Sequence, residues 1–355
     1  RDAWLVCHAL DQERPASVPE VAVLAERLAA ARQKSDCSLA YQCVQQLNQL
    51  GTPEAAVVLL QDLEARPEAY AHRDLTEESP ERVSPWASMA AAEEAATALA
   101  RRCLVKAAPG TAATSALALR PLAYATGPES LAVLTTAAES KLPAVRAEAA
   151  RCLLLRRAPG AAQRFVTLAM DDPTLLESLE PKLAQALVAA VGASLEPQLL
   201  RLRRHWPDVV ARGDDDQRAM AAVTAQAALA KAAPNKHLRD YERAVDQLLS
   251  SPVKKHRGMS PEEFAGDRLL LLASCARTHY VEHIGKRLRP LLAEGQTAWG
   301  LATAIDALAE VGATDAADVL SSQVRRPAPL GVKLALCNAA GRIDIPHLQP
   351  AMERW

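Results

Sequence analysis

The stretch VRAEAARCLLLRRAPGAAQRFVTLAM (residues 145–170) predicts two helices joined by a short turn at Gly160. Ala, Leu, Arg and Glu dominate it, and these residues lose little conformational freedom in a helix. The Pro-Gly pair in its middle is typical of a turn. The same order of helix, turn and helix recurs in LAYQCVQQLNQLGTPEAAVVLLQDLEA (39–65), LAQALVAAVGASLEPQLLRLRRHW (183–206), LLLLASCARTHYVEHIGKRLRPLLAE (269–294) and LATAIDALAEVGATDAADVLSSQV (301–324). Such a recurrence indicates a repeat protein, in which units of about 20–50 residues stack on their neighbours.

Apolar residues inside these stretches follow the period of an α-helix. Ala56, Leu60 and Leu63 are spaced so that they lie on one face, as are Leu301, Ile305, Leu308 and Val311. Thr52 before Pro53 is typical of a helix start, because its hydroxyl can cap the first turn. We predict that helices end in turns near Gly51, Gly127, Gly160, Gly192, Thr278, Gly312 and Gly341, with a further turn near Pro234.

The composition favours an all-α fold. Half of the 355 residues are hydrophobic, yet only 3% are aromatic, so Ala, Leu and Val must build the core. A sheet protein would need short runs rich in β-branched and aromatic residues, and the sequence contains no convincing pair of alternating strands. It also contains no phosphate-cradling, dinucleotide-binding, nucleophile-elbow or zinc-peptidase motif, apart from one short string discussed below.

The segment SKLPAVRAEAARCLLLRRAPGAAQRFVTLAMDDP (140–173) resembles a HEAT repeat of the bacterial kind. Pro143, Val145 and Arg146 match the opening of the first helix in that family, and Gly160 matches its turn. The resemblance implies a right-handed α-solenoid of stacked antiparallel helical hairpins, with the second helices lining a concave surface. We predict N-terminal helices and a first unit over 1–65, a connector over 66–89, a central array over 90–250, a basic loop over 251–261 and further units over 262–355.

Basic side chains gather late in several predicted second helices. On the arrangement that the resemblance implies, they would form a basic ridge that binds an anionic partner. The candidates are Arg164, Arg201, Arg204, Lys286, Arg289 and Arg325. The alternative is that these cations only complement the negative ends of their helices. A second candidate contact is the Pro-flanked loop that contains Lys254, Lys255, His256 and Arg257, for which a plain connector is the alternative.

The string His279-Tyr-Val-Glu282-His283 matches the zinc-binding pattern of inverted zinc peptidases. The predicted turn near Thr278 separates it from Cys275 and gives it no peptidase context. We therefore predict neither a metal nor another cofactor, and His279, Glu282 and His283 are the residues that would carry a metal site.

Seven scattered cysteines favour a reducing compartment such as the cytoplasm. An exported or lipid-anchored location stays open because the sequence begins at Arg1 and because Cys7 can form a disulfide with Cys37 or Cys43. No run of residues is long and apolar enough to span a membrane.

The leading functional prediction is a non-catalytic scaffold that binds another protein or itself. The formal net charge of −1 makes nucleic acid a less favoured partner, because phosphate binding needs a basic excess. Two alternatives stay open. One is a DNA-binding enzyme of the HEAT-like DNA glycosylase type, and the other is an exported structural protein that self-assembles.

Overall fold

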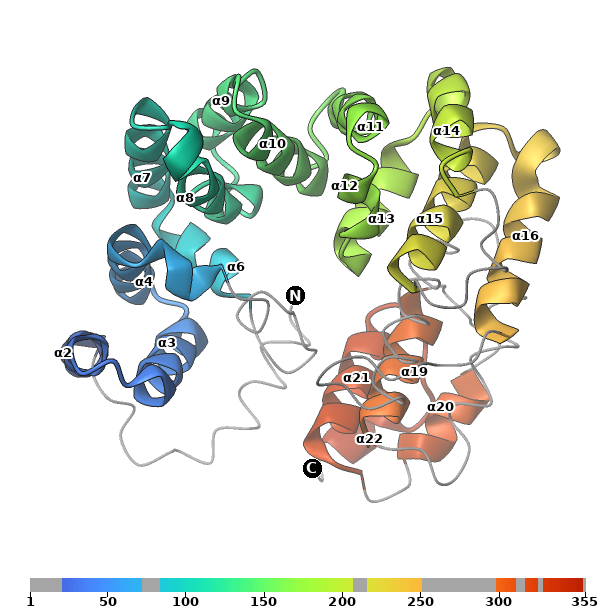
Figure 1. The fold of residues 1–355 in the computed structure, drawn as a ribbon. Helices are drawn as coiled ribbons and strands as arrows, with labels where there is room; N and C mark the ends of the chain where they lie inside the picture. Colours follow the sequence, from blue (N-terminus) through green and yellow to red (C-terminus); the bar gives the residue numbers. More distant parts are fainter. Residues whose placement is uncertain are drawn as a thin grey trace. The chain divides into compact units, whose positions relative to one another are not determined.

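The computed structural model describes residues 21–71, 84–206, 216–250, 298–310, 317–324 and 328–353. In these ranges every regular element is an α-helix or a short 3-10 helix, and the all-α prediction is confirmed (Figure 1). The chain forms two compact units, one ending at Ala161 and the other beginning at Ala162. This division falls inside the predicted central array and between the two helices of the segment that resembles a HEAT repeat.

The first unit is built from helices that follow one another closely along the chain. They are α2 (Val21–Gln33), α3 (Cys37–Leu50), α4 (Pro53–Ala65), η1 (Pro67–Tyr70), α6 (Pro85–Met89), η2 (Ala90–Ala92), α7 (Glu93–Val105), η3 (Pro109–Thr111), α8 (Ala112–Leu117), η4 (Arg120–Ala123), α9 (Pro128–Ala137) and α10 (Pro143–Leu155).

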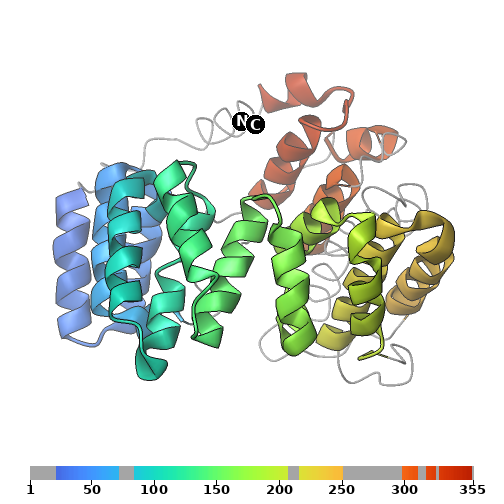
Figure 2. The ribbon, with the colours of Figure 1, turned by 90° about the horizontal axis from the view of Figure 1, so that it is seen from above.

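These helices lie in two rows. In one row α2 contacts α4, α4 contacts α7 and α7 contacts α9. In the other row α3 contacts α6, η4 joins α6 to α10, and α10 contacts α8. Figure 1 shows the second row on the inner side of the first, and Figure 2 shows the same helices from above, running alongside one another. Successive α-helices of the first unit thus alternate between the two rows.

The second unit contains two groups of described helices. The first group comprises α11 (Ala161–Asp171), α12 (Thr174–Glu177), α13 (Pro181–Ala190), η5 (Ala193–Leu195), α14 (Glu196–Arg203), α15 (Asp216–Ala232) and α16 (Pro234–Ser250). The second group comprises α19 (Ala298–Glu310), α20 (Ala317–Val324), α21 (Leu330–Ala340) and α22 (Leu348–Met352).

The first of these groups repeats the two-row pattern. The amide of Gln163 donates to Gln198 at 3.0 Å and so joins α11 to α14, while ion pairs described below join α14 to α16. Helix α13 contacts α15, which packs against both α14 and α16. Figure 1 shows α13 and α15 in one row and α11, α14 and α16 in the other.

Four of the five predicted helix–turn–helix stretches have both of their helices in the structure. They correspond to α3 with α4, α10 with α11, α13 with α14, and α19 with α20. The fifth stretch, residues 269–294, lies outside the described residues. The predicted turn near Pro234 is confirmed, because α15 ends at Ala232 and α16 begins at Pro234.

The predicted role of the glycines is confirmed at some turns and wrong at others. Gly51 ends α3 in the left-handed region at φ 59°, where a side chain would be strained. The turn after α10 contains two left-handed residues, Arg157 at φ 53° and Gly160 at φ 73°, so the predicted turn at Gly160 is confirmed. Gly127 is the N-cap of α9 and does not end a helix. The element before it is the short 3-10 helix η4.

Both ends of the segment 66–89, predicted to be a loop, are helical and buried. Tyr70 in η1 is fully buried, and so are Trp86 and Met89 in α6. The rings of Tyr70 and Trp86 lie 6.1 Å apart, and the guanidinium of Arg120 lies 5.4 Å above the Trp86 ring. The loop prediction failed here because these large side chains gain more from burial than the prolines around them suggest. Trp206 is also buried.

Candidate functional site

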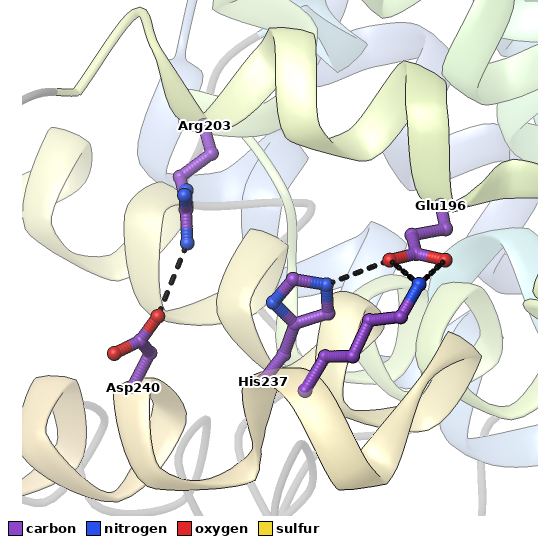
Figure 3. A network of polar contacts seen from close by, with 5 residues as sticks. Glu196, Arg203, His237 and Asp240 are labelled. Carbon is purple, nitrogen blue, oxygen red and sulfur yellow. Dashed lines mark hydrogen bonds and ion pairs between the residues drawn. The ribbon is translucent and has the colours of Figure 1, made fainter.

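Charged side chains join α14 to α16 at the surface of the second unit (Figure 3). The carboxylate of Glu196 accepts hydrogen bonds from Nζ of Lys236 at 3.1 and 3.2 Å. It also lies 3.0 Å from Nε2 of His237, which must carry the hydrogen because an ionised carboxylate only accepts. Further along both helices, Nη1 of Arg203 lies 3.3 Å from Oδ2 of Asp240. Three residue pairs therefore join α14 to α16.

Local sequence explains how each side chain reaches this network. Leu199 and Leu202 form the buried side of α14, and helix α15 packs against that helix. Glu196 and Arg203 are seven residues apart, which is close to two helical turns, and so they point in nearly the same direction. On α16, His237 and Asp240 are three residues apart and lie on neighbouring positions of one face.

The hydrogen bonds from His237, and then those from Lys236, hold the pKa of the Glu196 carboxyl below its ordinary value. Glu196 is therefore charged across the neutral range and its negative charge is already compensated. The network acts as a cross-link between helices whose partners satisfy one another.

Only part of the predicted basic ridge lies among the described residues. Arg201 and Arg204 are exposed on α14, and Arg164 is half-buried on the neighbouring α11. The buried side of α14 packs on α15, so the exposed Arg201 and Arg204 face away from α15. Lys286, Arg289 and Arg325 lie outside the described residues, as do Lys254, Lys255, His256 and Arg257.

The structure adds basic residues that the sequence analysis missed. Arg239 and Arg243 are exposed on α16, and they flank the contact between Asp240 and Arg203. Their signal in the sequence is the pattern Lys-His-Leu-Arg-Asp-Tyr-Glu-Arg, which alternates positive and negative charges along one helix.

The metal and disulfide candidates are tested only in part. His279, Glu282 and His283 lie outside the described residues, and elsewhere in the described part no three His, Cys, Asp or Glu side chains are grouped to hold a metal. Cys37 is exposed and Cys43 is buried, and both are free thiols. Cys7 lies outside the described residues.

A second polar cluster lies in the first unit and is buried. Nε and Nη2 of Arg32 donate to the two oxygens of Asp62 at 3.2 and 2.7 Å, which ties α2 to α4. The hydroxyl of Tyr70 donates to the same carboxylate at 2.8 Å. Burial, and then the Asp62 carboxylate, raise the pKa of Tyr70 well above its ordinary value. Tyr70 therefore stays protonated and acts as a hydrogen-bond donor.

Glu93 forms the centre of a third cluster, between α7 and α9. Its carboxylate accepts from the Ser130 hydroxyl at 2.7 Å and from the backbone N–H groups of Thr126 and Gly127 at 3.2 and 2.8 Å. Arg156 donates to the Ser130 oxygen at 2.7 Å and adds α10 to the cluster. Burial alone would raise the pKa of Glu93, but these hydrogen bonds and the charge of Arg156 outweigh it and lower the pKa.

Comparison of the chain with known protein families, curated proteins and solved structures finds no match. Among the described residues, no single helix is long and apolar enough to cross a membrane. One bent pair, Leu183–Ala190 with Ala193–Arg203, meets the same criteria of length and composition across a bend of 103°.

Proposed function

We propose that this chain is a non-catalytic interaction scaffold built as a HEAT-like α-solenoid. The observation that carries the proposal is the recurrence of polar contacts between helices that occupy alternate places along the chain. In the first unit these contacts join residues 30 and 38 positions apart, between α2 and α4 and between α4 and α7. In the second unit they join residues 35 and 37 positions apart, between α11 and α14 and between α14 and α16.

A nearly constant separation is what stacked helical hairpins would produce. Each hairpin buries its apolar side against its neighbours, and the polar contacts connect equivalent helices of successive hairpins. The contacts between α14 and α16 advance in the same direction along both helices, since Glu196 meets Lys236 and Arg203 meets Asp240. Equivalent helices of a solenoid run parallel, and this pair fits that expectation.

A scaffold function follows from this arrangement. A stack of hairpins offers a long surface whose side chains come from many helices, and its usual use is to hold another chain. The polar clusters described above cross-link helices, and their hydrogen bonds are used within the fold. The charged surface of the outer row is then the part that remains for a partner.

The test is a native pull-down with the purified full chain at low and moderate salt, followed by mass spectrometry and light scattering. We expect a second protein in a complex of fixed stoichiometry. If the chain instead returns alone, as an assembly whose mass rises with concentration, the scaffold proposal fails in favour of a self-assembling structural protein. Recovery of duplex DNA alone would favour the glycosylase alternative.

A further inference from the structure

Three arginines are exposed along the seam between α14 and α16. They are Arg204, Arg239 and Arg243, which we call the arginine ridge. Arg243 lies 3.5 Å from Asp240, and its side chain remains 68% exposed. The ion pair between Arg203 and Asp240 fixes the two helices side by side at the centre of this ridge.

Helical geometry directs these side chains to the same side of the seam. Each residue turns about 100° around its helix. Arg203 and Asp240 point toward each other across the seam. Arg204 follows Arg203 and is therefore rotated away from the seam by the turn of one residue. Arg239 precedes Asp240 on α16 and is rotated away from the seam by the same angle in the opposite direction. For two parallel helices, those opposite rotations bring Arg204 and Arg239 to the same face.

Burial agrees with this construction. Leu202 and Tyr241, which the same geometry turns to the other face, are both fully buried. Arg204 and Arg239 are exposed. The ridge is therefore the solvent-facing side of the α14–α16 pair.

The positive charge on α16 is not explained by helix stability. Lys236 and Arg239 both lie within the first two turns of α16, and its first turn contains no acidic residue. The N-terminus of a helix carries a partial positive charge, which disfavours cations there. A basic run at this position costs stability, and a local cost of this kind is expected where side chains serve a function.

Two described acidic side chains beside the ridge are already engaged by other partners. Glu196 is held by Lys236 and His237, and Asp240 lies in the seam between Arg203 and Arg243. The side chains of Arg204 and Arg239 are exposed and form no hydrogen bond or ion pair with any described residue.

We propose that the arginine ridge binds an acidic, Asp- and Glu-rich segment of a partner protein, a proposal that rests on the scaffold function above. Guanidinium groups bind carboxylates through two parallel hydrogen bonds, which makes arginine well suited to this recognition. From Arg239 to Arg243 the ridge follows about one turn of α16, about 6 Å. An extended peptide rises about 3.3 Å per residue, so about two residues span the ridge along this helix.

Charge favours a peptide over a nucleic acid. The ridge is short and the whole chain has a formal net charge of −1, whereas binding to nucleic acid draws on many phosphate contacts. A short acidic segment needs only the few arginines present here.

The experiment measures binding of a fluorescein-labelled oligoglutamate peptide to the full chain by fluorescence anisotropy. Oligoglutamine and a single-stranded oligonucleotide of equal length are the comparison probes. The test variant is Arg204→Glu with Arg239→Glu. The matched control is Arg27→Glu with Lys34→Glu, which changes the net charge equally at two exposed positions, one in α2 and one in the turn directly after it. We call it the α2 control. Circular dichroism establishes that each variant is folded.

We expect the ridge variant to bind oligoglutamate about tenfold more weakly than the wild type, and the α2 control to bind it as the wild type does. Binding should weaken at about 0.3 M salt, because exposed charges are screened. If the ridge variant does not fold, Arg204→Gln with Arg239→Gln replaces it, with a loss of about threefold expected.

In the peptide-binding assay, three results would overturn the proposal. The first is a wild type that does not prefer oligoglutamate to oligoglutamine. The second is an equal loss in the ridge variant and the α2 control, which would indicate general charge attraction. The third is tighter binding of the oligonucleotide that is lost in the ridge variant. If the ridge variant still captures the partner found in the pull-down, this inference fails while the scaffold function stands.

Discussion

The Asp62 cluster of the first unit and the α14–α16 network of the second unit use the same pairing of guanidinium with carboxylate in opposite surroundings. The side chains of Arg32 and Asp62 are 16% and 9% exposed, whereas those of Arg203 and Asp240 are 36% and 40% exposed. A pair withdrawn from water must satisfy all of its polar atoms, and a pair at the surface need not. The Asp62 cluster therefore depends on its ion pair for stability, whereas the exposed charges of the α14–α16 network are available to bind a ligand.

The largest effect is expected from Asp62→Ala. The change leaves Arg32 and the Tyr70 hydroxyl without their acceptor in a mostly buried cluster. We expect the free energy of unfolding to fall by about 3–5 kcal/mol, as measured by urea denaturation. Asp240→Ala removes a carboxylate of the exposed network and is the matched control. Equal losses in the two variants would contradict the contrast between the regions.

Gly127→Ala should have the next largest effect. A Cβ atom at this position would clash with the Glu93 carboxylate, which is fixed by hydrogen bonds from Ser130 and the α9 backbone. We expect a loss of about 1–3 kcal/mol, the usual cost of overpacking. Gly110→Ala is the control because nothing lies within 4 Å of its added Cβ atom. Thermal unfolding followed by circular dichroism measures both, and a stable Gly127→Ala variant would show that the carboxylate is easily displaced.

Acid should destabilise the protein through its glutamates. The pKa of Glu93 is lowered in the folded state relative to its ordinary value of 4.5. The stability that it contributes is fully present above that ordinary value and is lost as pH falls through the lowered pKa. Urea denaturation between neutral pH and about pH 3 should therefore show declining stability. The free energy of unfolding should fall less steeply with decreasing pH in Glu93→Gln than in the wild type. An equal fall in both would exclude Glu93 as a cause of the acid sensitivity.

The smallest effect is expected from Arg203→Ala. It removes an exposed ion pair with Asp240, and such pairs contribute about 0–1 kcal/mol. Urea denaturation in low and high salt measures it, and the difference between wild type and variant should shrink as salt rises. A loss as large as that of Asp62→Ala would mean that the α14–α16 network is structural and not a surface with spare charge.

Most of the individual helices were predictable because their signals are local. Thr52 caps α4 through Ala55 N at 3.3 Å as its position before Pro53 indicated, and Leu60 and Leu63 are buried as their spacing required. The ends of the segment 66–89 were not predictable, because the burial of Tyr70 depends on Asp62 and Trp86 rather than on its neighbours in the chain.

The sequence by itself determined the all-α class, the helix–turn–helix stretches and the exposed arginines of α14, since helix propensity, capping and periodicity act over a few residues. Only the tertiary structure decided which helices share a row, and thus that Arg204, directly after α14, shares an exposed face with Arg239 of α16. Contacts between residues 30–41 positions apart depend on how whole helices pack, and the many similar Ala- and Leu-rich faces of this chain do not distinguish one neighbour from another.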